Sequence, residues 1–225
     1  MVEILDYVLN MLKLLYPPLV ETFYMVLFST VFALIMGSII GIVLVITEKG
    51  HIWEKTYLHK ILDTIVNITR SIPFIILIIA LFPLSRMIVG TSIGLKAMIV
   101  SLSIASAPFV ARIIESSLKD VSWGIIESAL SVGANNFQII FKVMIPEAMP
   151  SLILGLTITI INILGYSAMA GAIGAGGIGD LAIRYGFHRF QTDVLMATII
   201  VLIIIVEVIQ HIGNFFANKV NKTKV

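Results

Sequence analysis

Long uncharged stretches rich in Leu, Ile, Val and Phe alternate with short polar segments along this chain of 225 residues. A helix of about 20 apolar residues crosses roughly 30 Å of hydrocarbon. The pattern therefore predicts an all-α membrane protein of about five transmembrane helices, with a longer loop between spans three and four. The predicted spans are Thr22–Thr47, Ile61–Phe82, Ile88–Ile113, Pro150–Gly171 within the uncharged stretch Ala148–Gly179, and Asp193–Ala217.

Composition excludes the main alternatives to a membrane protein. Apolar residues make up 59% of the chain, charged residues make up 12%, and the mean hydropathy is +1.06, whereas soluble domains are about 25% charged. The lack of Cys argues against a secreted disulfide scaffold, and a net charge of +2 argues against nucleic-acid binding. Little polar sequence lies outside the spans, so no sizeable extramembrane domain is expected.

The distribution of Lys and Arg predicts the orientation in the membrane. Basic residues concentrate in cytoplasmic loops, and five spans place the termini on opposite faces. With the N-terminus outside, nine basic residues lie inside: Lys49, Lys55, Lys60, Arg112, Lys119, Lys142, Lys219, Lys222 and Lys224. Five lie outside: Lys13, Arg86, Lys96, Arg184 and Arg189. We therefore predict a multi-pass cell-membrane protein (in the inner membrane of a two-membrane cell) with its N-terminus outside and its C-terminus in the cytoplasm.

The predicted cytoplasmic loop, Arg112 to Glu147, is far longer than a simple turn requires. Its apolar residues recur at helical spacing, Gly133 lies where a helix would end, and Asn135 can cap the next helix. Pro146 would end this second helix. We expect two short helices joined by a tight turn. They could rest on lipid headgroups or insert into a groove of a partner protein, and the pattern leaves both open.

The same loop resembles the EAA loop of type I ABC-importer permeases. That loop reads E-A-A, three residues, G, nine residues and I-x-L-P, and this chain has Glu127-Ser128-Ala129, Gly133 and Val143-Met144-Ile145-Pro146 at the same spacing. Ser, Val and Ile replace the family's Ala, Ile and Leu. In that family the loop docks on an ATPase subunit. The resemblance implies that the coupling residues are Glu127, Ser128, Ala129, Gly133, Ala134, Ile145 and Pro146, within the 122–146 loop.

The resemblance also implies roles for three of these residues. Glu127 would face polar groups of the ATPase, Gly133 would permit the sharp turn, and Pro146 would start the next span.

Further motifs resemble the methionine-importer branch of this family, over about 17–213, the expected permease domain. They are Arg70–Phe74, Val89–Leu95, Ala107–Phe109, Gly165–Met169 and the Gly-rich run Gly171–Gly179. The resemblance implies a permease homodimer in the lipid bilayer, two cytoplasmic ATPase subunits that bind ATP and Mg, and an extracytoplasmic substrate-binding lipoprotein. The permease itself would hold no cofactor or metal. Residues 1–16 would form an extracytoplasmic segment, and 214–225 a basic cytoplasmic tail.

Other motifs are better explained by membrane structure than by enzyme chemistry. The chain has no G-x-x-x-x-G-K-[ST] P-loop, so an ATPase would have to be another chain. Gly174–Gly179 fits G-x-G-x-x-G, but it follows a membrane span where a nucleotide site needs a strand, and we expect a flexible or re-entrant turn. Ser167 and His211 are expected near opposite ends of neighbouring spans, too far apart for a catalytic dyad. The four His residues show no paired metal spacing.

Charged and polar groups within the spans are candidates for the solute pathway. Arg70 precedes Ser71-Ile72-Pro73, where Pro frees a carbonyl four residues earlier. Arg70 could bond such carbonyls, pair with Asp63 or Glu115, or contact solute, and we favour structural pairing. The full set of pathway or gate candidates is Arg70, Asn162, Tyr166, Ser167 and Met169.

The hypothesis is thus a permease subunit of an ATP-driven importer that works by alternating access, with methionine as the expected solute. The alternatives are an ion-coupled secondary amino-acid transporter and a permease of the same ABC class for another small solute. An ion-coupled transporter favours inverted repeats and paired intramembrane carboxylates, and we find no such repeat.

Overall fold

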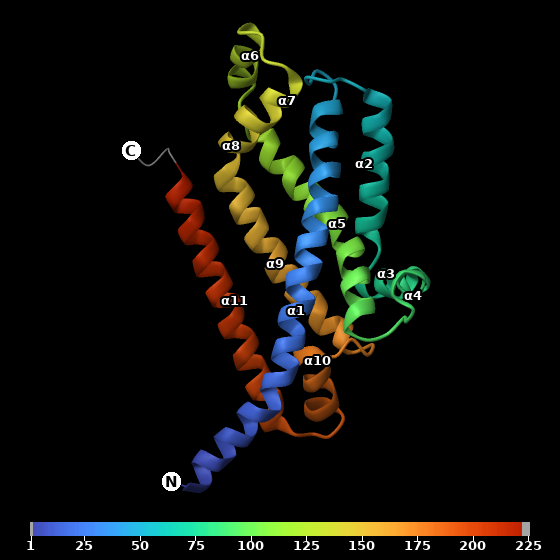
Figure 1. Ribbon diagram of the computed structural model, residues 1–225, viewed down its shortest axis with the longest axis vertical. Coiled ribbons are helices and arrows are strands. Elements are labelled where there is room, and N and C mark those ends of the chain that lie inside the picture. Colours follow the sequence, from blue (N-terminus) through green and yellow to red (C-terminus); the bar gives the residue numbers. More distant parts are fainter. Residues whose placement is uncertain (1, 222–225) are drawn as a thin grey trace. The chain divides into compact units, whose positions relative to one another are not determined.

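The computed structural model describes residues 2–221, which form α-helices and π-helical segments and contain no strand (Figure 1). The predicted all-α fold class is therefore confirmed. The elements are α1 (Val2–Thr47), α2 (Thr56–Ser71), α3 (Phe74–Ala80), α4 (Phe82–Val89), α5 (Leu95–Lys119), α6 (Trp123–Ser131), α7 (Asn136–Gln138), η1 (Ile139–Met144), α8 (Ile145–Glu147), α9 (Met149–Gly171), α10 (Gly177–Leu181), η2 (Ala182–Phe187) and α11 (Thr192–Val220).

Four of the described helices are long and apolar enough to cross a membrane: α1, α5, α9 and α11. The first, fourth and fifth predicted spans lie within α1, α9 and α11, which confirms them. Helix α1 begins well before the predicted span, so residues 2–16 continue the same helix. Helix α11 likewise continues to Val220, whereas Lys222 and Lys224 of the predicted basic tail lie outside the described residues.

The second predicted span is interrupted, as the Ser-Ile-Pro sequence indicates. Helix α2 ends at Ser71, and α3 begins at Phe74. Pro73 disfavours the helical conformation of the residue before it, and Ile72 is extended at φ −80° and ψ 128°. The protein has five candidate spans only if α2 and α3 together count as one.

The predicted bounds of the third span, Ile88–Ile113, are wrong at both ends. Gly90 has φ +84° and caps α4 in the left-handed conformation, so the membrane helix starts only at Leu95. At the other end, α5 continues to Lys119 although its last two turns are charged. These charges pair with one another and with neighbouring helices, so a polar segment remains helical.

The helices form two compact units. The first consists of the chain up to Phe32, Pro73–Ala105 and Ile160–Val208, and the second of Ala33–Ile72, Ser106–Thr159 and the chain from Ile209 onward. Four long helices, α1, α5, α9 and α11, contribute residues to both units.

The core of the first unit joins α1, α3, α5 and α9. Its fully buried side chains include Met25, Ile78, Met98 and Leu102. A buried hydrogen bond of 2.7 Å between the hydroxyls of Ser85 and Ser101 ties α4 to α5.

In the second unit, α1 and α5 approach closely through glycine. Gly37 and Gly41 are four residues apart on α1, the small-xxx-small spacing that lets membrane helices meet backbone to backbone. A Cβ atom on Gly37 would lie 2.5 Å from Val110 Cβ, and one on Gly41 would lie 2.6 Å from the Ala111 carbonyl oxygen. Any side chain at either position would therefore force the two helices apart.

Candidate functional site

The loop between α5 and α9 contains two helical segments and a tight turn, as predicted. It belongs entirely to the second unit and lies at the C-terminal end of α5 and the N-terminal end of α9 (Figure 1). Helix α6 ends in a pair of backbone hydrogen bonds, from Gly133 N to Leu130 O at 2.9 Å and from Ala134 N to Ala129 O at 3.1 Å. This Schellman arrangement needs a left-handed residue, and Gly133 has φ +81°.

Asn135 caps the second segment as the sequence predicts. Its Oδ1 accepts from Gln138 N, its own N–H donates to Gln138 Oε1, and both distances are 2.9 Å. This reciprocal pair satisfies two otherwise orphaned donors.

The predictions that Pro146 ends the loop helix and starts the next span are both wrong. The helical path runs through α7, η1 and α8 to Glu147, and α9 begins only at Met149. The wide π-helical turn before Pro146 gives the ring room, because Ile145 N bonds back to Ile140 O.

The loop is seated on a dense apolar cluster. Ile126 of α6 and Ile139 and Met144 of η1 are buried against Val45 of α1 and Leu118 of α5. The loop therefore packs directly against α1 and α5.

The predicted coupling residues divide between this seat and the exposed surface. Ala129, Ala134 and Ile145 pack against the buried cluster. Glu127 and Ser128 are exposed on α6, and the Ser128 hydroxyl donates to Gly124 O. The structure thus leaves Glu127 available to a partner, while its role remains a prediction.

Sequence reasoning missed the exposed apolar tip of the loop. Val132 is 84% exposed, Phe137 is 69% exposed, and the ring of Phe137 contacts that of Phe141 with 4.4 Å between centroids. Exposed apolar patches of this kind mark binding surfaces. These residues were visible in the sequence as helical periodicity, but the pattern does not tell a buried face from an exposed one.

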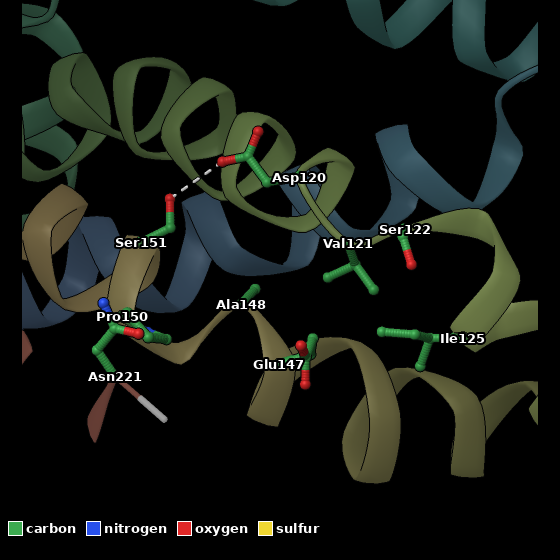
Figure 2. A pocket seen from close by; sticks show the side chains of 9 residues that line it. All are labelled: Asp120, Val121, Ser122, Ile125, Glu147, Ala148, Pro150, Ser151 and Asn221. Carbon is green, nitrogen blue, oxygen red and sulfur yellow. Dashed lines mark hydrogen bonds between the residues drawn. The ribbon is translucent and has the colours of Figure 1, made fainter. Parts of the chain in front are cut away.

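An open pocket of about 310 Å³ lies at the root of the loop (Figure 2). Asp120 and Ser122 line it from the segment that follows α5, and Glu147 of α8 and Ser151 of α9 line it from the other side of the loop. A long hydrogen bond of 3.4 Å, from Ser151 Oγ to Asp120 Oδ2, joins the start of α9 to the segment that follows α5. The same Ser151 hydroxyl lies 3.1 Å from the Ser117 hydroxyl of α5, so α9 is tied to the end of α5 at this point.

His51, in the connection between α1 and α2, contacts the start of α6. Its ring meets that of Trp123 edge-on at 5.7 Å between centroids. Its Nδ1 is buried and has no hydrogen-bond partner among the described residues. Burial lowers the pKa of His51; the Glu48 carboxylate opposes this shift, and the Lys119 ammonium adds to it.

Acidification should therefore loosen this contact. A His in the unfolded chain has a pKa of about 6.5, so the stabilising effect is complete above that pH and is lost as the pH falls through the lower folded pKa. We expect the thermal unfolding midpoint of the permease to drop between about pH 7.5 and 5.5, and His51→Gln to show a smaller drop. An identical pH dependence in the variant would contradict this role for His51.

The predicted pathway residues lie in different units. Arg70, in the second unit, is exposed, and the two carboxylates proposed for it, Asp63 and Glu115, both bind Arg112 instead. The favoured pairing of Arg70 with either carboxylate is therefore wrong, because Arg112 on the neighbouring helix already occupies both.

The other four candidates lie on α9 in the first unit. The Tyr166 ring stacks on Phe74 at 3.6 Å, and the buried Ser167 hydroxyl donates to Leu164 O at 2.7 Å. Met169 is exposed, and Asn162 is half-buried. The Ser167 hydroxyl is thus used within its own helix, and a pathway role for these residues stays a prediction.

The Gly-rich run forms the expected turn and continues as α10 and η2. Glu21 Oε2 of α1 accepts from Gly177 N at 2.7 Å, and Thr22 Oγ1 accepts from Ile178 N at 2.9 Å. Gly176 and Gly177 both have positive φ, near +80°. Residues 2–221 contain no strand before this run and no group of three His, Asp or Glu placed to hold a metal.

Removing the Glu21 carboxylate should release this turn locally. A hydrogen bond to a charged group contributes about 1.5–3 kcal/mol, so Glu21→Ala should speed amide hydrogen exchange at Gly177 about tenfold or more. Thr22→Val is the matched control, because it should act chiefly on Ile178. Unchanged exchange at Gly177 in the Glu21 variant would show that the carboxylate does not hold the turn.

The described residues form an all-helical, multi-pass membrane fold with an exposed loop between α5 and α9. Residues 33–223 match the family described as "binding-protein-dependent transport system inner membrane component". The chain belongs to this family, and it is a membrane transport subunit.

Individual relatives agree with this family assignment. The chain is 44% identical over 201 residues to a probable D-methionine transport system permease protein of Vibrio cholerae, covering 89% of both chains. It is 45% identical over 179 residues to the methionine import system permease protein of Bacillus subtilis, covering 80% of this chain and 81% of that protein.

Solved structures extend the comparison. A chain of the MetNI methionine ABC transporter in an inward-facing conformation matches with a TM-score of 0.93 and 41% identity, covering 95% of this chain and 99% of that chain. A chain of an amino acid ABC transporter shares the fold at 18% identity, with a TM-score of 0.77 and 97% of both chains covered.

Proposed function

We propose that this chain is the permease subunit of a methionine ABC importer and forms the translocation pathway as a homodimer. The observation that carries the proposal is the near full-length similarity to permeases whose names specify methionine transport. The 0.93 TM-score to a chain of a methionine ABC transporter supports it as well. The N-terminus would lie outside and the C-terminus in the cytoplasm, in keeping with the Lys and Arg distribution.

Two ATPase subunits would dock on the loop between α5 and α9 and supply ATP and Mg, because the sequence has no P-loop of its own. The exposed Val132, Phe137 and Phe141 offer an apolar surface that a groove on the ATPase could cover, and Glu127 of α6 is exposed for a polar contact. A substrate-binding lipoprotein would deliver solute on the opposite face.

The mechanism follows from the attachment of this loop. The ATPase must grip the loop differently in its two states, since only differential contact can shift a conformational equilibrium. The buried cluster beneath α6 would pass that movement to α1 and α5. Arg70, Asn162, Tyr166, Ser167 and Met169 are the proposed pathway or gate positions.

The substrate is tested by uptake into proteoliposomes that contain the complete importer and its binding protein. ATP-dependent accumulation of labelled methionine, competed by unlabelled methionine and not by unrelated amino acids, supports the proposal. ATP-dependent uptake of a different solute would keep the ABC mechanism and refute methionine. Uptake that follows an ion gradient without ATP would favour the secondary transporter.

A further inference from the structure

A chain of ion pairs crosses the second unit and centres on the buried Glu115 of α5. Arg112 Nη1 lies 2.6 Å from Glu115 Oε2, and Arg112 Nη2 lies 2.7 Å from Asp63 Oδ1 on α2. The same Nη2 also donates to Asn67 Oδ1 at 2.7 Å. These contacts fix α2 to α5.

The other oxygen of Glu115 extends the chain toward α1. Lys119 Nζ lies 2.9 Å from Glu115 Oε1 and 2.9 Å from Glu48 Oε2, just after the end of α1. Glu115 thus uses one oxygen for each cation and joins the α2 pair to the α1 pair. The side chain of Glu115 is only 3% exposed, whereas those of Asp63 and Glu48 are 35% and 37% exposed.

This chain of charges lies directly beneath the loop that carries α6. Leu118, next to Lys119, and Val45, at the end of α1, belong to the apolar cluster on which α6 is seated. Movement of α6 therefore reaches the ends of α1 and α5 first, where the ion pairs begin. Charge-assisted hydrogen bonds are short and strong, so Glu115 holds the Arg112 and Lys119 side chains in place.

We propose that Glu115 is a positioning residue for transport: it orients Arg112 and Lys119 of α5 so that they hold α2 and the end of α1 to α5, and these three helices move with the α6 loop. This inference rests on the proposed function, since it assigns a route for the movement imposed by the ATPase. Both ion pairs of Glu115 lie within α5, so what Glu115 contributes is the placement of Arg112 and Lys119, the two cations that reach Asp63 of α2 and Glu48 after α1.

Glu115→Gln tests this connection with little risk to folding, because two cations and two carboxylates remain in balance. In the reconstituted importer we expect normal assembly and ATP hydrolysis, with solute transported per ATP reduced about tenfold. Glu54→Gln is the matched control: Glu54 is an exposed carboxylate of the same unit that accepts from Gly50 N and makes no ion pair within residues 2–221. It should keep the wild-type ratio.

A second variant covers the case in which Glu115→Gln fails to assemble. Asp63→Asn acts at the more exposed end of the same connection and should also lower the transport ratio. Combined with Glu115→Gln, it should add no further loss, because both interrupt one route. An unchanged ratio in assembled Glu115→Gln, or in Asp63→Asn if the former does not assemble, would overturn the proposal. A parallel fall in hydrolysis and uptake would also overturn it.

A measurement without substrate separates this inference from the methionine assignment. The chain has no Cys, so single cysteines at the exposed Lys60 of α2 and Ser131 of α6 can carry nitroxide labels. Their distance distribution should stay narrow with and without ATP in the wild-type importer and broaden in Glu115→Gln. An equally narrow distribution in the variant would count against the proposal even if the transported solute is not methionine.

Discussion

Gly133→Val should abolish most ATP-dependent uptake while leaving the permease folded in the membrane. Gly133 has φ +81°, a conformation that costs a residue with a Cβ roughly 1–2 kcal/mol and that a β-branched side chain adopts least readily. The Schellman hydrogen bonds that end α6 would open, and Val132 and Phe137 would leave their places at the tip of the loop. Uptake and ATP hydrolysis are measured in the same proteoliposomes. Either ATP hydrolysis should continue without uptake, or the ATPase should fail to bind and both activities should be lost.

The same loop offers a closely matched control. A methyl group added to Gly133 or to Gly124 would meet no atom within 4 Å, and only Gly133 has a positive φ. Gly124→Ala should therefore preserve uptake and stabilise α6 by up to about 1 kcal/mol, whereas Gly133→Ala should impair uptake. Equal uptake in the two alanine variants would mean that the turn conformation does not matter for coupling.

Gly41→Ala should clearly lower the stability of the second unit. The new Cβ would lie 2.6 Å from the carbonyl oxygen of Ala111 and 2.8 Å from Ile114 Cβ, so the backbones of α1 and α5 would have to separate. Overpacking of this kind costs about 1–3 kcal/mol. Thermal unfolding of the purified permease in detergent should show a midpoint several degrees lower.

Gly165→Ala on α9 makes the same chemical change in a different environment. Gly165 is helical and exposed in the single chain, and its added Cβ would meet nothing within 4 Å. This variant should unfold at or slightly above the wild-type temperature, since Ala favours the helix over Gly. If both variants unfold at the same temperature, close contact at Gly41 does not limit stability.

Local chemistry made much of this architecture predictable. The length of the uncharged stretches identified the membrane spans within α1, α9 and α11. Two single residues, Pro73 and Gly133, identified the interruption after α2 and the turn after α6. These features depend on neighbours along the chain, which a sequence displays directly. The same reasoning placed the end of α5 too early, because charged residues were counted as leaving the membrane. Their spacing of three and four residues, Arg112 to Glu115 to Lys119, was the available signal that the helix continues.

Contacts between distant segments could not be predicted in this way. Nothing in the order of residues indicates that Glu21 accepts from Gly177, 156 positions later, or that His51 meets Trp123. Arg70 was considered as a partner of Asp63 or Glu115, whereas Arg112 binds both, and choosing between the two arginines requires the helix packing. Exposure of Val132 and Phe137 likewise depends on which face of the loop meets α1 and α5.

The seat of the coupling loop has a consequence for how the protein is made. Among the described residues, the apolar cluster beneath α6 and its packed neighbours draw on residues from Ile42 to Leu152 and on none beyond. The chain leaves the ribosome from its N-terminus, so every residue of this seat has been synthesised before α11 begins at Thr192. The surface proposed to receive the ATPase can therefore be assembled on a nascent permease that still lacks its last membrane helix.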